Sequence, residues 1–215
     1  MTQPTPPPHT PDTSQPRKPD ALLWIDVETT ALDPREGQLL ETGILATDMQ
    51  GETIEPLRTW TIRHDDIRMN PTTAHAIDMH VKNGLIRQTF EHGQPADRIA
   101  RDIQTLIDAL ADRYTLHPAG TQPEFDLQWT RHHLGLNLEH LDYHKLDMTA
   151  LRILTRQTGL DTPARATTDH RAANCITRDL VEYANLVATI TALAAGRGEP
   201  CGGCHEGDGG RPVCR

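Results

Sequence analysis

The sequence predicts an α/β fold in which a mixed sheet, led by three antiparallel strands, is flanked by helices. Two observations support this prediction. Three strand-like segments joined by short, turn-rich links come first, and strand-like segments then alternate with helical patterns. Consecutive strands with short links are typical of an antiparallel meander, whereas the later alternation is typical of a sheet covered by helices.

The leading strands are expected at residues 21–30, 38–49 and 55–64. The first reads ALLWIDVETT and is apolar over its first half. The second carries Gly43, which is expected to mark a bulge, and the third alternates between polar and apolar side chains. The links ALDPREG and DMQGET contain the Pro, Gly and Asp residues that are common in turns. These segments therefore read as one meander.

The later elements alternate between strands and helices. The clearest helical pattern covers residues 95–113, where isoleucines and leucines recur with the spacing of one helix face. The other expected elements are strands at residues 113–120 and 143–148, and helices at 123–135, 149–159 and about 169–195. They supply the second half of the sheet and the helices that cover it.

Length and composition indicate one domain between two polar ends. Residues 1–20 are rich in Pro and Thr and are expected to be disordered, residues 21–195 to fold, and the Gly- and Cys-rich residues 196–215 to form a flexible tail. No apolar run reaches the ~20 residues of a membrane helix, so no membrane partner is expected. Because no secretory signal is visible, the four cysteines are expected to be reduced in a cytoplasmic protein. The net charge of −9 argues against a broad basic surface for duplex DNA but not against short single strands.

The C-terminal tail holds a cluster of metal-binding residue types, namely Cys201, Cys204, His205 and Cys214. Three thiols and one imidazole can bind a tetrahedral Zn²⁺ ion. The CGGCH segment also matches covalent haem attachment, but no haem-pocket pattern accompanies it. A zinc clip therefore stays open as an interpretation, and a flexible tail without metal is the one we favour.

Two carboxylates lie at the end of the first strand. Asp26 and Glu28 are two residues apart, so their side chains share one face of the sheet. Like charges this close disfavour each other's ionisation, and a divalent cation with oxygen ligands is the usual remedy. The alternative is an exposed strand end with both acids in water. The pair alone does not decide between these interpretations.

Two further residues suggest a catalytic cleft. Asp126 lies in the first turns of a predicted helix, after Phe125, which can anchor that helix in the core, and His170 opens the last helix. Around a central first strand, these elements could converge, with carboxylates holding metal and an imidazole taking a proton from the attacking water. That set of groups suits phosphodiester hydrolysis. Taken singly, Asp126 reads as a helix-surface acid and His170 as an ordinary helix-start residue.

Three segments, in this order, resemble the motifs of the DEDD-type 3′→5′ exonucleases of the histidine branch. WIDVETTAL resembles their Asp-x-Glu motif, AGTQPEFDLQW their second motif and HRAANC their His-x-Ala-x-x-Asp motif. The resemblance covers nearly all of the expected domain. It implies a ribonuclease-H-like fold, two Mg²⁺ or Mn²⁺ ions and stepwise release of nucleotides from a 3′ end. It also implies that Asp26, Glu28 and Asp126 hold the metals and that His170 is the general base.

Within that superfamily, DMHVKNGL and KLDMTALRIL resemble segments of oligoribonucleases. The resemblance implies that Leu32 wedges between bases and that His80 contacts the terminal phosphate, with Thr29 and Phe125 as further substrate contacts. The expected substrate is the 3′ end of a short single strand, RNA rather than DNA, and the expected products are nucleoside 5′-monophosphates. Related oligoribonucleases are dimers, so a homodimer is one option.

One departure from the pattern is serious. Cys175 stands where the third motif has an aspartate, five residues after His170. A thiol is a poor ligand for Mg²⁺. Metal binding could be weakened, or Asp179, one turn further along the helix, could substitute for the missing acid. Otherwise the domain binds nucleic-acid ends without cutting them, and Cys175 is a small buried residue.

Two smaller departures concern the substrate. The oligoribonucleases have a tryptophan where this chain has His75, and an arginine where it offers His144 or Lys145. The part of the site that would cap a short RNA is therefore altered. A broader exonuclease on single-stranded DNA stays open as a second enzymatic hypothesis, and a catalytically weak end-binding module as a third.

Overall fold

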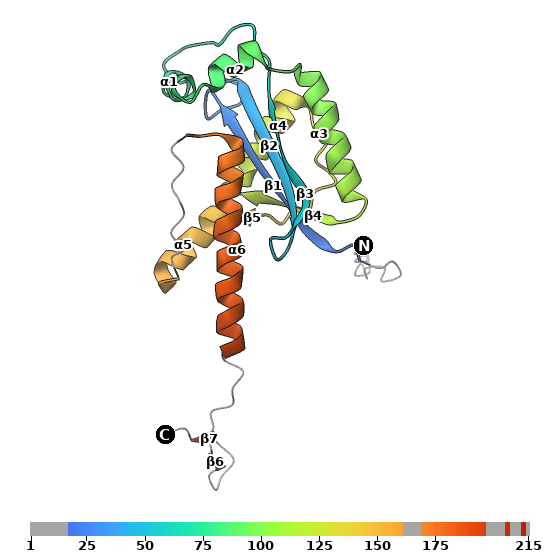
Figure 1. The fold of residues 1–215 in the computed structure, drawn as a ribbon, viewed down its shortest axis with the longest axis vertical. Helices are drawn as coiled ribbons and strands as arrows, with labels where there is room; N and C mark the ends of the chain where they lie inside the picture. Colours follow the sequence, from blue (N-terminus) through green and yellow to red (C-terminus); the bar gives the residue numbers. More distant parts are fainter. Residues whose placement is uncertain (1–16, 161–168, 197–204, 207–211, 214–215) are drawn as a thin grey trace, which may run out of the picture.

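Five strands form one mixed sheet in the computed structural model, which describes residues 17–160, 169–196, 205–206 and 212–213. The strands are β1 (Asp20–Thr29), β2 (Leu39–Asp48), β3 (Thr53–Thr61), β4 (Thr115–Gly120) and β5 (Leu146–Asp147). Their order across the sheet is β3-β2-β1-β4-β5, with β1 in the centre (Figure 1). The first three strands pair antiparallel, and β4 runs parallel to both β1 and β5. The expected fold class is confirmed.

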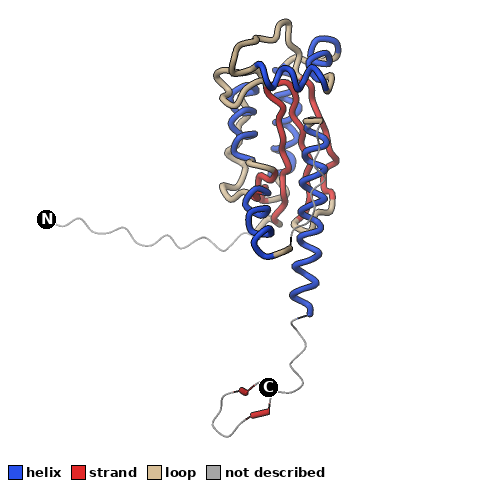
Figure 2. Tube along the Cα trace, turned by 90° about the vertical axis from the view of Figure 1, so that its left-hand side faces the viewer, coloured by secondary structure: helices blue, strands red, loops and turns tan. Residues whose placement is uncertain are grey.

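Helices cover both faces of this sheet and one end of it (Figures 1 and 2). They are α1 (Ala74–Lys82), α2 (Leu85–Glu91), α3 (Ala96–Ala111), α4 (Pro123–Leu134), α5 (Met148–Thr158) and α6 (Ala172–Gly196). Side chains of α3 and α4 join the core on one face, and side chains of α5 and α6 join the core on the other. Figure 1 places α1 and α2 at the end of the sheet to which β1 points. No helix in the described ranges is long and apolar enough to cross a membrane.

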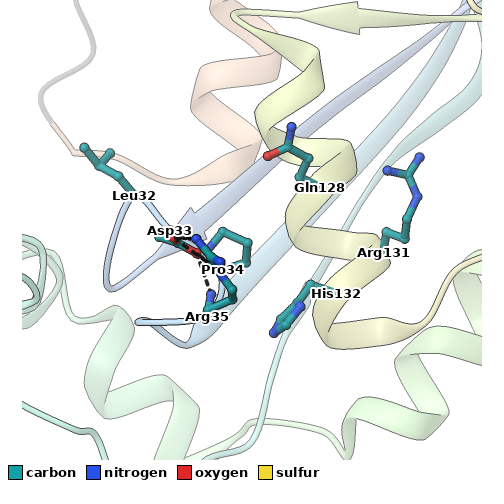
Figure 3. Close-up of a pocket in the computed structure, with 7 residues that line it drawn as sticks. All are labelled: Leu32, Asp33, Pro34, Arg35, Gln128, Arg131 and His132. Carbon is teal, nitrogen blue, oxygen red and sulfur yellow. Dashed lines mark hydrogen bonds and ion pairs between the residues drawn. The ribbon is translucent and has the colours of Figure 1, made fainter.

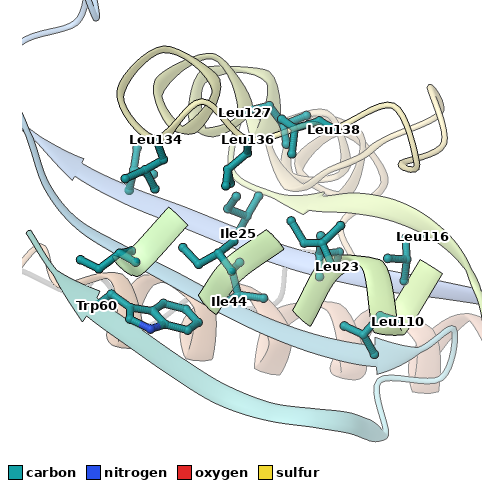
Figure 4. Close-up of a cluster of buried hydrophobic side chains, with 14 of the residues drawn as sticks. Leu23, Ile25, Ile44, Trp60, Leu110, Leu116, Leu127, Leu134, Leu136 and Leu138 are labelled. Atoms are coloured by element: carbon teal, nitrogen blue, oxygen red, sulfur yellow. The ribbon is translucent and has the colours of Figure 1, made fainter. Parts of the chain in front are cut away.

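The alternation of side chains along β1 decides which face the site occupies. Leu23 and Ile25 point into the core beneath α3 and α4, which Figure 4 shows. Leu22 and Trp24 point the other way, into the core beneath α6. Since every second side chain shares a face, the carboxylates that continue the Leu22–Trp24 series project toward α6.

Several expected element boundaries need correction. The helices α1 and α2 were not predicted, and the strand expected at residues 143–148 is only the two-residue β5. Gly43 pairs in register with neighbours on β1 and β3 and is not itself a bulge. The irregularities of β2 lie between Leu39 and Glu41 in its pairing with β1, and between Ile44 and Thr47 in its pairing with β3. Gly43 instead permits the close approach of α6, because a Cβ there would lie 2.9 Å from Ile176 Cδ1 and 3.1 Å from Ala172 Cβ.

Two other expectations, the division of the chain into a domain with two tails and the zinc clip, concern the chain ends. Residues 1–16 and the thiols of Cys201, Cys204 and Cys214 lie outside the described residues. In the C-terminal segment, β6 (His205–Glu206) pairs antiparallel with β7 (Pro212–Val213). The division into residues 1–20, 21–195 and 196–215, and the zinc clip, stay predictions.

Candidate active site

The two acids of β1 lie beneath the N-terminal end of α6, where the sheet face is shielded from solvent. Glu28 is buried and pairs across the ladder with Glu41 of β2, while Asp26 is half-buried and pairs with Gly43. The Oδ2 atom of Asp26 is buried and has no hydrogen-bond partner within the described part of the chain. An unpaired buried carboxylate oxygen is costly, so a proton or a cation is needed here.

Asp126 reaches the same place from α4. The pairing of β1 with β4 ends at Trp24 and Ala119, and beyond it the N–H of Val27 donates to Oδ1 of Asp126 at 2.9 Å. This bond ties the first turns of α4 to the central strand. The other oxygen, Oδ2, is buried and, counting described residues only, has no partner. The expected convergence of β1 and α4 is therefore present in the structure.

The three acids share one electrostatic environment. Burial raises the pKa of Asp26 to about 8, aided by Asp179 and Glu41 and opposed by Arg178. Burial raises the pKa of Glu28 to about 9, and Asp26 and Glu41 add to the rise. Burial, with Asp26 as the main neighbouring charge, also raises the pKa of Asp126 well above its ordinary range. Without a cation, pKa values this high leave Asp26 and Glu28 mostly protonated at neutral pH.

Cys175 of α6 lies beside Glu28 and joins the cluster of acids. Its thiol lies 4.0 Å from Oε1 of Glu28. One ligand atom each from Asp26, Glu28 and Cys175 fall within 4.8 Å of one another, close enough to surround one ion. The buried, unpaired oxygens of Asp26 and Asp126 suit a divalent cation, so the acids fit a metal site. The thiol is the only member of this donor set that does not suit Mg²⁺.

A buried ion pair fixes the start of α6, and sequence reasoning missed it. Glu41 accepts two hydrogen bonds from Arg171, at 3.1 Å and 2.5 Å, and a third from the N–H of Ala172 at 3.0 Å. Arg171 also donates to Oε1 of Gln88 on α2 at 2.7 Å. This arrangement caps the helix and holds Cys175 over the acids. The visible signal was an acid in the middle of an otherwise apolar second strand.

Asp179 does not take the place of the missing aspartate. Its carboxylate is buried and accepts hydrogen bonds from Arg152 at 2.7 Å, Arg178 at 2.8 Å and Thr121 at 2.7 Å. Arg152 also binds Glu182, so the group joins α5, α6 and the loop after β4. Two guanidinium groups already neutralise this carboxylate. The substitution considered from the sequence is therefore wrong for this conformation.

His80 lies within the protein rather than on a substrate surface. Its ring is fully buried, with Nε2 3.6 Å from Oε2 of Glu28 and Nδ1 3.3 Å from the amide nitrogen of Asn83. Burial lowers the pKa of His80 to about 4, which leaves the imidazole neutral at pH 7. The expected phosphate contact stays a prediction.

His170 is exposed immediately before α6, in a left-handed backbone conformation with φ of 43°. The loop is held by Asn83, whose amide donates to the backbone oxygens of Asp169 and His170. His170 lines a pocket of about 470 Å³ with residues from α1 that include His75 and Lys82. The structure records no contact between His170 and the three acids, so its role as general base stays a prediction.

The other expected substrate contacts lie around the loop after β1. Leu32 is 88% exposed and lines a pocket of about 820 Å³ with Asp33, Pro34, Arg35, Gln128, Arg131 and His132 (Figure 3). Thr29 donates to the backbone oxygen of Ala31, which shapes this loop. Phe125 of α4 is partly buried in the core and packs against Trp129 of the same helix at a centroid distance of 5.9 Å. It therefore anchors the first turns of α4 in the core.

Comparisons with known proteins place the chain beside oligoribonucleases in sequence and exonuclease I in fold. No family model matches the chain. A probable oligoribonuclease of Schizosaccharomyces pombe is 25% identical over 167 residues, which cover 75% of this chain and 65% of that protein. An oligoribonuclease of Francisella tularensis subsp. novicida is 22% identical over 163 residues, covering 76% and 92%. The structure of E. coli exonuclease I in complex with a dT13 oligonucleotide matches with a TM-score of 0.60 at 16% identity, covering 83% of this chain and 43% of that one.

By fold and by sequence, the chain is similar to the DEDD-type 3′→5′ exonucleases. Among them it resembles the oligoribonucleases. The resemblance seen in the sequence is thereby confirmed. The chain spans about two thirds of the S. pombe relative and less than half of the exonuclease I chain, so its own activity has to be argued from the site.

Proposed function

We propose that the chain is a metal-dependent 3′→5′ exonuclease of short single-stranded nucleic acid, RNA rather than DNA, that releases nucleoside 5′-monophosphates. The observation that supports this proposal is the convergence of Asp26, Glu28 and Asp126 from β1 and α4. The Oδ2 atoms of Asp26 and Asp126 are buried and have no hydrogen-bond partner in the described ranges. Relatives named oligoribonuclease support the choice of short substrates.

The acids divide into two sets by geometry. Asp26 and Glu28 group with residue 175, whereas Asp126 lies outside that group and has Asp26 as its main neighbouring charge. Asp26 would therefore be shared between two Mg²⁺ or Mn²⁺ ions. When bound, such ions supply the positive charge that activates the attacking water and stabilises the leaving oxygen of an in-line displacement.

The remaining residues position substrate and move protons. His170 would take the proton of the attacking water at a ring nitrogen, after its side chain turns from solvent toward the acids. Leu32 would stack against a base near the 3′ end, since its side chain stands free on the loop after β1. Thr29 shapes that loop, and Phe125 holds Asp126 in place through the packing of α4.

A cleavage assay tests the proposal. Labelled RNA and DNA dinucleotides and longer strands of each would be incubated with Mn²⁺ or EDTA, and released nucleotides measured. Asp26→Ala should lower cleavage about 100-fold or more, because a carboxylate that would serve both metals is lost. The matched control is Asp97→Ala, an exposed acid on α3. Cleavage that resists EDTA, or is equal in Asp26→Ala and wild type, would contradict the proposal.

Two observations favour alternatives that the same assay separates. The solved exonuclease I complexes contain single-stranded DNA, so equal trimming of long DNA would favour a broader DNA exonuclease. The thiol of Cys175 favours a module that holds a nucleic-acid end, and binding without any turnover would support it. The homodimer expected from the resemblance stays a prediction.

A further inference from the structure

We propose that Cys175 is a metal ligand and that it shifts the preference of this site from Mg²⁺ toward softer divalent cations such as Zn²⁺ or Co²⁺. The proposal rests on the proposed function for the presence of a metal beside Asp26 and Glu28. It adds the chemical identity of the ion, which the resemblance to DEDD-type exonucleases assigns differently. On binding, the thiol loses its proton to solvent and the thiolate sulfur coordinates the ion.

The position of the sulfur suits a shared ion. Metal–thiolate bonds are about 2.3 Å long and metal–carboxylate bonds about 2.0–2.2 Å, so two such ligands lie about 3.6 Å apart at a tetrahedral ion and at most about 4.5 Å apart in any geometry. The distance from Cys175 Sγ to Oε1 of Glu28 is 4.0 Å. The wider group that includes Asp26 falls within 4.8 Å, which a small side-chain adjustment closes.

A second observation points independently to a ligand. Asp126 is 3% exposed, and its Oδ2 atom is buried without a hydrogen-bond partner in the ranges that the structure covers. The Oδ2 atom of Asp26 is also buried and has no hydrogen-bond partner among the described residues. Asp26 belongs to the same donor group as the sulfur and is the main neighbouring charge of Asp126, so the feature is a mixed oxygen and sulfur donor set rather than a single thiol.

The backbone holds the sulfur where an acid is expected. Glu41 and Arg171 fix the start of α6, and Gly43 lets the helix approach β2 closely. The nearest acid on the same helix face, Asp179, is already bound by two guanidinium groups. Thiolate is a soft ligand that Zn²⁺ and Co²⁺ accept, whereas Mg²⁺ prefers hard oxygens in octahedral geometry. The donor set therefore selects against Mg²⁺.

The test uses the full-length chain in which Cys201, Cys204 and Cys214 are replaced by serine, so that Cys175 is the one thiol left. Co²⁺ is titrated into this parent protein while the thiolate-to-cobalt charge-transfer absorption is recorded. Calorimetry gives the affinities for Zn²⁺ and Mg²⁺. The variants Cys175→Ser and Cys175→Asp are measured in the same way, with thermal unfolding in EDTA to establish that each is folded.

The parent protein should show the charge-transfer band, and both variants should lack it. We expect Cys175→Ser to lower the Zn²⁺ affinity about tenfold or more, and Cys175→Asp to raise the Mg²⁺ affinity by a similar factor. A parent protein that binds Co²⁺ without the band overturns the proposal, and this measurement depends on no change at residue 175. Equal Mg²⁺ affinity in the parent and a folded Cys175→Asp variant also overturns it.

The same samples separate this proposal from the proposed function. A charge-transfer band in a protein that cleaves no strand with any of the ions supports the thiolate ligand and contradicts the nuclease. Mg²⁺-dependent cleavage by a parent protein that lacks the band supports the nuclease and contradicts the ligand.

Discussion

At the scale of single residues, burial and pairing give identical side chains opposite properties. The Arg35 guanidinium beside Asp33 lowers the pKa of that carboxyl group to about 2, near the protein surface. Burial raises the pKa of Asp26 to about 8 at the end of β1. The Asp33 carboxylate is neutralised by Arg35, whereas the Asp26 carboxylate needs a proton or an added cation. This difference marks the candidate site.

These shifts predict how the stability of the metal-free protein depends on pH. Asp26 and Glu28 have ordinary pKa values of 3.8 and 4.5 but about 8 and 9 in the folded protein. Between these limits the folded state binds more protons than the unfolded state, so the free energy of unfolding should fall as pH rises from about 4 to about 9. Urea unfolding in EDTA across this pH range measures the slope.

The control for this prediction replaces the acids by neutral isosteres. Asp26→Asn combined with Glu28→Gln should flatten much of the pH dependence, whereas Asp102→Asn combined with Glu91→Gln, two exposed acids, should leave it in place. A slope of the same size in the Asp26/Glu28 variant as in wild type would show that other groups cause it.

At the scale of elements, the position of α6 depends on one buried acid of β2. Glu41 is 2% exposed and accepts hydrogen bonds from the Arg171 side chain and from the first N–H of α6. Removing one partner of a buried pair leaves the other charge poorly compensated. Since α6 also carries Cys175, removing the carboxylate of Glu41 should affect both the stability of the fold and metal binding.

We therefore expect Glu41→Gln to lower the free energy of unfolding by about 2–4 kcal/mol. The matched control is Asp97→Asn, which removes an exposed helical pair with Arg101 and should cost less than about 1 kcal/mol. Chemical denaturation of both variants measures the difference, and calorimetry with Zn²⁺ tests the effect on the site. Equal losses in the two variants would show that Glu41 does not anchor α6.

The elements that the sequence predicts most clearly are those with a long apolar pattern. β1, β2 and α3 bury continuous or periodic apolar side chains, so their periodicity is visible without the fold. By contrast, α1 buries only Ile77 and His80, and α2 buries only Leu85 and Thr89. Two buried residues in a short helix leave no periodic signal, which is why both helices were missed.

In the candidate site, too, the sequence predicts what local geometry sets and misses what depends on packing. The alternation of β1 predicts that Asp26 and Glu28 share a face, because strand geometry alone sets it. Other contacts of the site depend on how helices pack on the sheet. Asp179 meets Arg152 because α6 packs beside α5. His80 is buried beside Glu28 because α1 packs at the end of β1. Those contacts join segments far apart in the chain, so no local pattern reports them.

At the scale of the whole molecule, the proposed function requires a chain of net charge −9 to bind a polyanion. Bound cations would reverse the charge at the acids. Further along the surface, Arg131 and His132 of α4 line the pocket beside the exposed Leu32 (Figure 3). We expect these side chains to meet the nucleotides that precede the base at Leu32 in a strand whose 3′ end lies at the acids.

Arg131→Gln combined with His132→Gln should therefore lower cleavage of longer strands more than cleavage of dinucleotides. Each lost phosphate contact should also reduce the slope of log affinity against log salt by about 0.7 for a single strand. The comparison is kcat/KM for both substrate lengths at several salt concentrations, with Arg98→Gln, exposed on α3 and outside the pocket, as the control. If dinucleotides and longer strands lose activity equally, the pocket contacts the terminal nucleotides. In that case the pocket would not discriminate between substrate lengths.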